Sequence, residues 1–227
     1  MVVQRPLRSL CIALLAFALA GAAPLGVLSE TKGAPFASPA DTTSAGRAGT
    51  VPSALVAAAS VGPAPALADL VNPDGSPFDL ASLAGHPTLL FFGYTHCPDV
   101  CPLTIGEIIG VFEAQPEARA VFVSIDPERD TPAFLTDWSA YLPEGLHPVT
   151  GSLGAVRRAA DGFGVRYARV ETSSAAGYTF SHTADVFLID GRGQLLGTFP
   201  FGTSGATMAA DVAAVAADIA PMAGGVS

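Results

Sequence analysis

The segment FFGYTHCPDVCPLT, residues 91–104, most constrains the fold, because it joins a strand pattern to a helix pattern through two cysteines. The apolar residues 88–94 predict a buried strand, and residues 103–112 can form a helix. A strand, a thiol loop and a helix in this order place Cys97 and Cys101 at the carboxyl edge of a buried sheet.

Two prolines shape the backbone around these cysteines. Pro98 and Pro102 disfavour helical dihedrals at Cys97 and Cys101, the residues that precede them. Pro102 suits the first helical position, so Cys101 is expected near the N-cap. Free N–H groups and the helix dipole favour thiolates at such a place. Two thiolates on one short loop can bind a soft metal ion or close a disulfide, and the three-residue gap differs from the Cys-x-x-Cys motif.

The rest of the sequence alternates between strand and helix patterns. A predicted hairpin joins residues 167–170 to 177–180. Further strands are expected over residues 118–125, 146–150, 185–189 and 194–199, and helices over 132–141, 153–163 and 206–220. This order predicts an α/β fold, a thioredoxin-like three-layer sandwich with a central mixed sheet.

The N-terminal part predicts export from the cytoplasm. Arg5 and Arg8 precede an apolar run over residues 10–28, so residues 1–28 are either a signal peptide or a membrane anchor. Residues 29–67 are rich in Ala, Gly, Pro, Ser and Thr and are expected to form a low-complexity tether. The folded domain is expected over residues 68–222. A net charge of −9 without a basic patch argues against nucleic-acid binding, and membrane contact is expected only through the N-terminal segment.

A third chemical group lies just before the strand at residues 185–189. His182 is expected beside the cysteine loop, because the start of this strand packs there in such a sheet. Two thiolates and a neutral imidazole suit copper, although a lone loop histidine is more often an ordinary surface residue.

Three ordered motifs support this interpretation: GYTHCPDVCP at residues 93–102, VSIDPERDTP at 123–132, and the segment 178–190 with Tyr178, His182 and FLID. Through them the sequence resembles the Sco/SenC family of copper-binding, thioredoxin-like proteins over residues 70–220. The resemblance implies that Cys97, Cys101 and His182 bind Cu(I) or Cu(II) and that the two cysteines form a redox-active disulfide.

The resemblance also implies a function. The family helps to mature the CuA centre of cytochrome c oxidase, so we expect a metallochaperone with no catalytic residue. Its expected partners are the CuA-bearing subunit, and other periplasmic copper chaperones or thiol reductants. Its expected location is the periplasmic side of the bacterial inner membrane, where it is anchored or released after signal cleavage.

Five neighbouring residues have both a functional and an ordinary interpretation. His96 adjoins Cys97, and it is expected to orient the loop rather than to bind metal. Asp99 either raises the pKa of a thiolate or meets a partner, or it is an ordinary solvated carboxylate. Asp126, Arg129 and Asp130 either brace the site or dock a partner, or they form an ordinary turn ion pair.

Two other functions stay open at the level of the sequence. A thiol–disulfide reductase would keep the cysteines of the oxidase reduced, but such enzymes usually place a cis-proline where this chain has Ala184. A copper or redox sensor would bind the metal without transferring it, and the sequence does not separate it from a chaperone.

Overall fold

The computed structural model describes residues 53–173 and 177–219 of the chain. Within these residues the main sheet has seven strands in the spatial order β1-β9-β8-β3-β4-β5-β2. They are β1 (Val56–Pro63), β2 (Leu70–Val71), β3 (Thr88–Gly93), β4 (Arg119–Ser124), β5 (Leu146–Gly151), β8 (Val186–Ile189) and β9 (Gln194–Phe199). The pairs β3–β4 and β4–β5 are parallel and the other pairs are antiparallel, which confirms the predicted mixed sheet.

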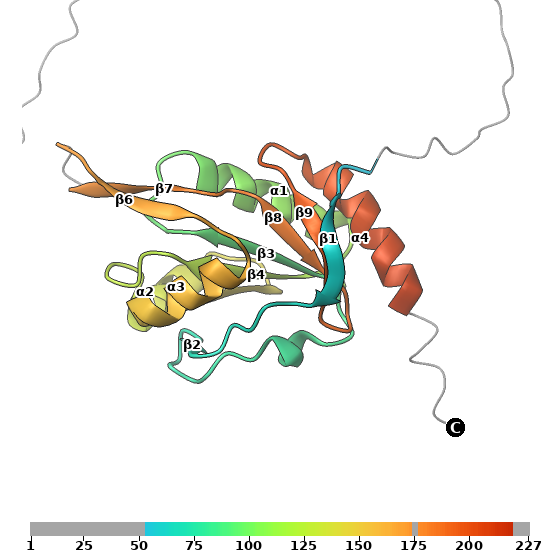
Figure 1. Cartoon of the computed structure of the whole chain (residues 1–227), viewed down its shortest axis with the longest axis horizontal. Helices are drawn as coiled ribbons and strands as arrows, with labels where there is room; N and C mark the ends of the chain where they lie inside the picture. Colours follow the sequence, from blue (N-terminus) through green and yellow to red (C-terminus); the bar gives the residue numbers. More distant parts are fainter. Residues whose placement is uncertain (1–52, 174–176, 220–227) are drawn as a thin grey trace, which may run out of the picture. The chain divides into compact units, whose positions relative to one another are not determined.

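Helices cover both faces of this sheet. They are α1 (Val100–Ala114), α2 (Pro132–Ser139), α3 (Leu153–Gly162) and α4 (Gly205–Ile219), and a short 3-10 helix spans Leu80–Leu83. Helix α2 packs on one face through the rings of Trp138 and Phe122, 4.9 Å apart, and α1 and α4 lie side by side (Figure 1). On the other face Phe163, at the end of α3, contacts Phe92 at 5.6 Å between ring centres. The three predicted layers are therefore present.

Strand β3 forms the centre of the core and leads directly into the cysteine loop. All six of its residues are buried between β4 and β8. Its four large side chains, Leu89, Leu90, Phe91 and Phe92, are each at most 1% exposed. Full burial of one such side chain stabilises the fold by roughly 1.5–3 kcal/mol, so the carboxyl end of β3 is a firmly held platform.

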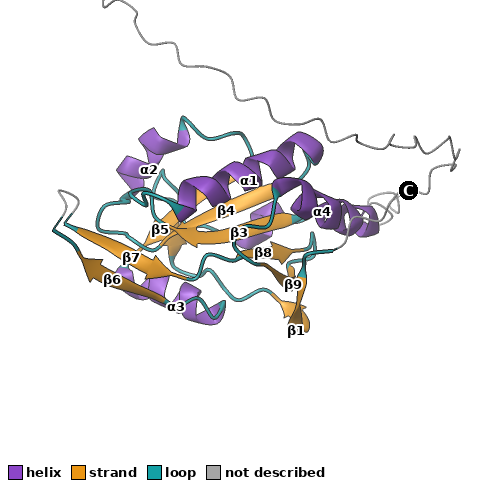
Figure 2. Cartoon of the chain, turned by 90° about the horizontal axis from the view of Figure 1, so that it is seen from above, coloured by secondary structure: helices purple, strands orange, loops and turns teal. Residues whose placement is uncertain are grey.

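A hairpin lies apart from the main sheet. Among the described residues, strands β6 (Tyr167–Glu171) and β7 (Tyr178–His182) pair only with each other, and they extend from the end of the domain opposite to β1 (Figure 2). The hairpin was expected at this place in the chain, but β7 continues two residues further than predicted, to His182.

The predicted tether is wrong for residues 56–63, because these residues form β1 at the edge of the sheet. Strand β1 is mostly exposed and rich in alanine, so its sequence lacks the hydrophobic alternation that reveals a half-buried strand. Its partner strand offers Gly197, where a Cβ atom would lie 2.3 Å from the Val56 carbonyl oxygen. The glycine therefore permits the close approach of the edge strand.

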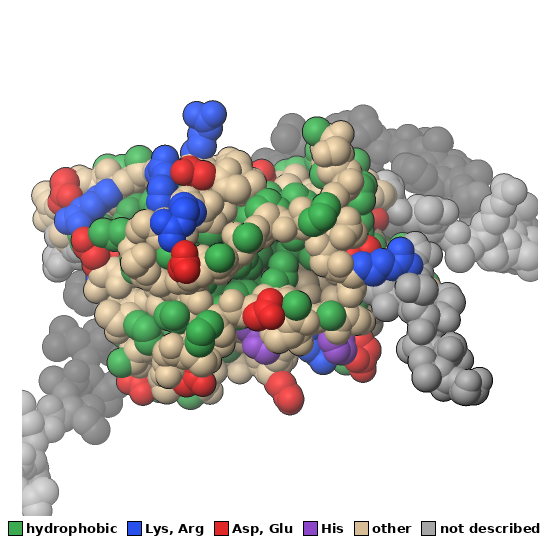
Figure 3. Space-filling view, turned by 60° about the horizontal axis from the view of Figure 1, so that its bottom comes forward, with side chains coloured by type: hydrophobic (Ala, Val, Ile, Leu, Met, Phe, Trp, Pro, Cys, Tyr) green, Lys and Arg blue, Asp and Glu red, His purple; other side chains and the backbone are tan. Residues whose placement is uncertain are grey.

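The predicted signal peptide or anchor at residues 1–28 lies outside the described residues. Across residues 53–173 and 177–219, no helix combines the length and the apolar character that crossing a bilayer requires. On the face drawn in Figure 3, acidic and basic side chains are interspersed around a hollow lined by hydrophobic side chains.

Candidate metal centre

Helix α1 begins earlier than the sequence predicted. Its N-cap is Asp99, so Cys101 is the second helical residue and Pro102 the third. The prediction that Cys101 is not helical is wrong, because the bias against helical dihedrals before proline is only a preference. Proline is tolerated throughout the first turn, since the N–H groups there have no partner within the helix.

Cys97 is a half-buried residue in the loop before this helix. Its sulfur accepts a hydrogen bond from the backbone N–H of Cys101, at 3.4 Å. Burial alone would raise the pKa of Cys97, but hydrogen bonds from the amides of Asp99 and Cys101 outweigh it, and the pKa is lowered. The expectation that the helix start favours a thiolate therefore holds for Cys97.

The same expectation is wrong for Cys101. This residue is 1% exposed, and burial, together with the neighbouring Cys97 sulfur, raises its pKa. Its sulfur packs so closely that a Cβ atom at Gly93 would lie 3.0 Å from it. Without metal, Cys101 is a thiol at neutral pH, because desolvation outweighs the helix dipole.

His182, at the end of β7, completes the cluster. Its Nδ1 lies 2.8 Å from the carbonyl oxygen of Thr183, which can only accept, so Nδ1 carries the proton. Its Nε2 therefore presents a lone pair, 3.5 Å from the Cys101 sulfur. Burial lowers the pKa of His182 and keeps the imidazole neutral, the form that binds metal.

The structure brings the donor atoms of the three predicted ligand residues close together. The sulfurs of Cys97 and Cys101 and a ring nitrogen of His182 all lie within 4.8 Å of one another. The closest pair of these donor atoms, the Cys101 sulfur and His182 Nε2, is 3.5 Å apart. Two sulfurs and one imidazole form a donor set that suits copper, and Cu(I) in particular.

Asp130 is fully buried and holds the start of the cysteine loop. One of its oxygens accepts the backbone N–H of Thr95 at 3.0 Å and the Ser124 hydroxyl at 2.6 Å. The other oxygen accepts the Thr95 hydroxyl at 2.5 Å. Because Thr95 lies two residues before Cys97, Asp130 links the end of β4 to the metal-binding loop.

Asp126 and Arg129 form an ion pair that reaches the hairpin. The Tyr178 hydroxyl donates to Asp126 at 2.8 Å, and Arg129 donates to the Tyr178 carbonyl oxygen at 3.2 Å. Arg129 and Arg169 also pack against the Tyr178 ring, at 3.8 and 3.6 Å from its centre. These contacts join the loop after β4 to the strand that carries His182.

His96 and Asp99 lie at the surface beside the three ligand residues. The His96 Nδ1 donates to the Thr95 hydroxyl oxygen at 2.9 Å, and its ring lies 5.6 Å from that of Phe134. It contributes no atom to the cluster of three donors. Asp99 is the N-cap of α1 without a side-chain hydrogen bond to the helix.

Sequence reasoning assigned no role to Tyr94, which links the two sides of the centre. Its buried ring contacts that of His182 edge to face, with centres 6.0 Å apart. Its hydroxyl contacts Thr179 on β7. A tyrosine at the end of an otherwise apolar strand was the available signal, because a buried hydroxyl needs a partner.

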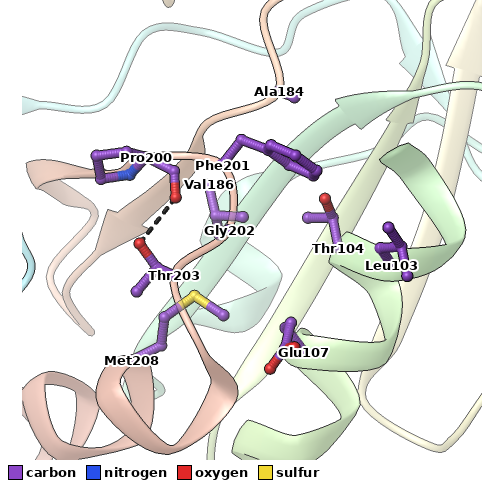
Figure 4. Close-up of a pocket in the computed structure, with 10 residues that line it drawn as sticks. All are labelled: Leu103, Thr104, Glu107, Ala184, Val186, Pro200, Phe201, Gly202, Thr203 and Met208. Carbon is purple, nitrogen blue, oxygen red and sulfur yellow. Dashed lines mark hydrogen bonds between the residues drawn. The ribbon is translucent and has the colours of Figure 1, made fainter. Parts of the chain in front are cut away.

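An apolar pocket of about 150 Å³ adjoins the centre (Figure 4). Helix α1 forms one side through Leu103, Thr104 and Glu107, and the loop after β9 forms the other. Two of its lining residues lie near the ligands in the chain: Thr104 follows Cys101 by three residues, and Ala184 follows His182 by two.

Known proteins resemble this chain in sequence. The SCO1/SenC family model matches residues 68–217. A SCO2-like protein of Rickettsia prowazekii is 31% identical over 136 residues, which cover 58% of this chain and 66% of the relative. The human mitochondrial SCO1 homologue is 30% identical over 155 residues, which cover 61% of this chain and 52% of the relative. The chain thus spans just under two thirds of the first relative and about half of the second.

Solved structures agree with these matches. The copper-bound ScoI of Bradyrhizobium japonicum has a TM-score of 0.59 and 34% identity, covering 68% of this chain and 98% of that structure. The apo Sco1 of Thermus thermophilus has a TM-score of 0.62 and 29% identity, covering 73% and 98%. These neighbours confirm the predicted thioredoxin-like fold, and the family match extends over the whole candidate centre. The chain belongs to the SCO1/SenC family.

Proposed function

We propose that this chain is a copper metallochaperone that helps to assemble the CuA centre of cytochrome c oxidase. The observation that supports it most directly is the convergence of Cys97, Cys101 and His182 within 4.8 Å. Similarity to the copper-bound ScoI of Bradyrhizobium japonicum supports copper as the cargo.

The protonation states of the three ligand residues indicate which protons copper must displace when it binds. The Cys101 thiol lies against the lone pair of His182 Nε2, and copper replaces the proton between them. Cys97, with its lowered pKa, supplies a thiolate more readily. Binding therefore releases protons, as is general for thiol ligands.

The exposure of the ligands describes how copper leaves. Cys97 is half-buried and lies on a loop, whereas Cys101 is 1% exposed. A receiving ligand therefore approaches from the Cys97 side and displaces that sulfur first. Once the copper has left, exchange with a partner disulfide, which takes up the two electrons and is itself reduced to two thiols, can convert Cys97 and Cys101 to a disulfide that has no thiolate left for copper.

The recipient in this proposal is the CuA-bearing subunit of the oxidase. Other periplasmic copper chaperones or thiol reductants load the site and keep it reduced. In this proposal the domain works on the periplasmic side of the inner membrane, and residues 1–28 serve to anchor or export it.

The first test is copper stoichiometry in the reduced full chain. One copper ion per chain is expected, and a value near zero or near two contradicts the site. His182→Ala should lower Cu(II) affinity steeply and Cu(I) affinity less, since two thiolates suffice for Cu(I).

The second test is made in cells. The CuA content of the oxidase is measured in strains carrying only His182→Ala or only Cys97→Ser, and both are expected to lose CuA. Normal CuA with the histidine variant and loss with the cysteine variant would instead favour a thiol–disulfide reductase. Normal CuA in a strain that lacks the protein would favour a sensor.

A further inference from the structure

The position of the third ligand depends on the β6–β7 hairpin. His182 is the last residue of β7, and β7 pairs with β6 and with no strand of the seven-stranded sheet in the described part of the chain. Both cysteines, in contrast, follow β3 at the centre of that sheet. The distance between His182 and the cysteines is therefore set by contacts that tie β7 to the end of β3.

Tyr94 makes the most direct of these contacts. It immediately follows β3 and is 2% exposed. Its hydroxyl lies 2.5 Å from that of Thr179, and it accepts the backbone N–H of Phe180 at 3.2 Å. One phenol oxygen thus holds two successive residues of β7.

The same tyrosine also reaches both ligand groups. The backbone N–H of Cys97 donates to the Tyr94 carbonyl oxygen at 3.2 Å, so the main chain of Tyr94 turns the cysteine loop. Its ring meets the edge of the His182 imidazole. Tyr94 is therefore in contact with the cysteine loop, the histidine strand and the imidazole itself.

Tyr178 provides a second anchor at the start of β7. Its hydroxyl donates to the buried Asp126 on the loop after β4. The strand is thus fixed at its first residue by Tyr178 and at its second and third residues by Tyr94.

We propose that Tyr94 is a positioning residue for copper, which sets His182 at bonding distance from the two thiols by holding β7 through its hydroxyl. The inference rests on the proposed copper site, because it concerns that site's third ligand. Tyr94 itself does not bind the metal, and removing its hydroxyl leaves all three ligands in the chain.

Tyr94→Phe in the full chain tests this role. Cu(II) affinity is expected to fall roughly tenfold to a hundredfold, the range seen when residues that orient metal ligands are changed. Cu(I) affinity should change less, since it depends on the two sulfurs, and only the Cys97 sulfur also interacts with the Tyr94 hydroxyl. The Cu(II)–sulfur absorption band and the nitrogen hyperfine splitting in the EPR spectrum should shift toward those of His182→Ala.

Tyr167→Phe is the matched control. Tyr167 lies on the same hairpin and pairs with His182 in the strand register, but its side chain interacts with Arg157 of α3. Loss of its hydroxyl should leave Cu(II) affinity within about twofold, a difference of about 0.4 kcal/mol.

A double-mutant cycle separates positioning from general stability. In the His182→Ala background, Tyr94→Phe should have no further effect on Cu(II) affinity, because the ligand that it positions is gone. Equal losses in both backgrounds, or unchanged affinity and spectra in a chain that binds one copper, would overturn the inference. Absence of copper binding by the unaltered chain would instead overturn the proposed function. If Tyr94→Phe does not fold, Tyr178→Phe tests the same strand in the same cycle, with the same expected and contrary results.

Discussion

Asp130 gives the sharpest test of how this fold supports the metal-binding loop. The fully buried carboxylate receives three hydrogen bonds, two of them from Thr95 and one from Ser124. Asp130→Ala removes both acceptor oxygens and leaves all three donors without their partner. A buried donor left without a partner costs roughly 1–3 kcal/mol, so the free energy of unfolding should fall by about 3–5 kcal/mol.

Asp130→Asn should cost less, for a geometric reason. The amide keeps one oxygen, which can still accept the Thr95 N–H and the Ser124 hydroxyl. Its NH₂ group would take the place of the other oxygen and donate to the Thr95 hydroxyl oxygen. The hydroxyl hydrogen of Thr95 would then rotate away from residue 130. Only the contribution of the charge is lost, so we expect a cost of about 1–2 kcal/mol.

Urea unfolding of the reduced full chain measures both values. Trp138 is the single tryptophan and packs on Phe122 in the core, so its fluorescence reports the loss of tertiary structure. Asp137→Asn, at an exposed aspartate of α2, is the control and should change stability by less than about 0.5 kcal/mol. A loss below about 1 kcal/mol for Asp130→Ala, or equal losses for the Ala and Asn variants, would refute the reasoning from these three bonds.

Three further predictions concern the sulfurs. The raised pKa of Cys101 keeps it a thiol at neutral pH, whereas copper binds the thiolate. Cu(I) affinity should therefore rise with pH, by roughly tenfold per pH unit for each proton released. Competition titrations between pH 6 and 8 measure this dependence, and an affinity that does not change with pH would contradict it. Gly93→Ala should lower the free energy of unfolding by about 1–3 kcal/mol and weaken copper binding, since its Cβ would lie 2.7–3.0 Å from Phe91, Phe122 and Cys101. Gly106→Ala is the control, because a Cβ there on α1 would have nothing within 4 Å, and it should leave stability unchanged or raise it slightly. Oxidation to a Cys97–Cys101 disulfide, verified by mass, should abolish copper binding, and tight binding by the oxidised form would show that the sulfurs are not the ligands.

The central part of this fold is readable from the sequence because its signals are local. Strand β3 is a continuous apolar run, and α1 follows at helical spacing, so both the sheet edge and the cysteine loop are predictable. Strand β1 is not, since its alanines and serine are held by backbone pairing with β9 at an exposed edge. Such pairing depends on what lies opposite, and the sequence pattern of one strand does not contain it.

The ligand set was predictable, but the supporting contacts were not. Cys97, Cys101 and His182 belong to motifs that the resemblance identifies. The two hydrogen bonds between the Tyr94 hydroxyl and β7 join residues that are 85 and 86 positions apart in the chain. The opposite shifts of the two cysteine pKa values also require burial to be known, because spacing and helix position treat both sulfurs alike.

This difference between the two sulfurs bears on how the centre exchanges copper. A site with two exposed thiolates would bind copper tightly but would also be open to oxidation at both sulfurs. Here Cys101 is buried as a thiol against a neutral imidazole, whereas Cys97 is half-buried and its pKa is lowered. Cys97 is then the natural first contact for an arriving copper ion and the first ligand to be displaced. In the proposed site Cys101 would join the coordination only after it loses its thiol proton, so copper binding at Cys101 is coupled to proton release.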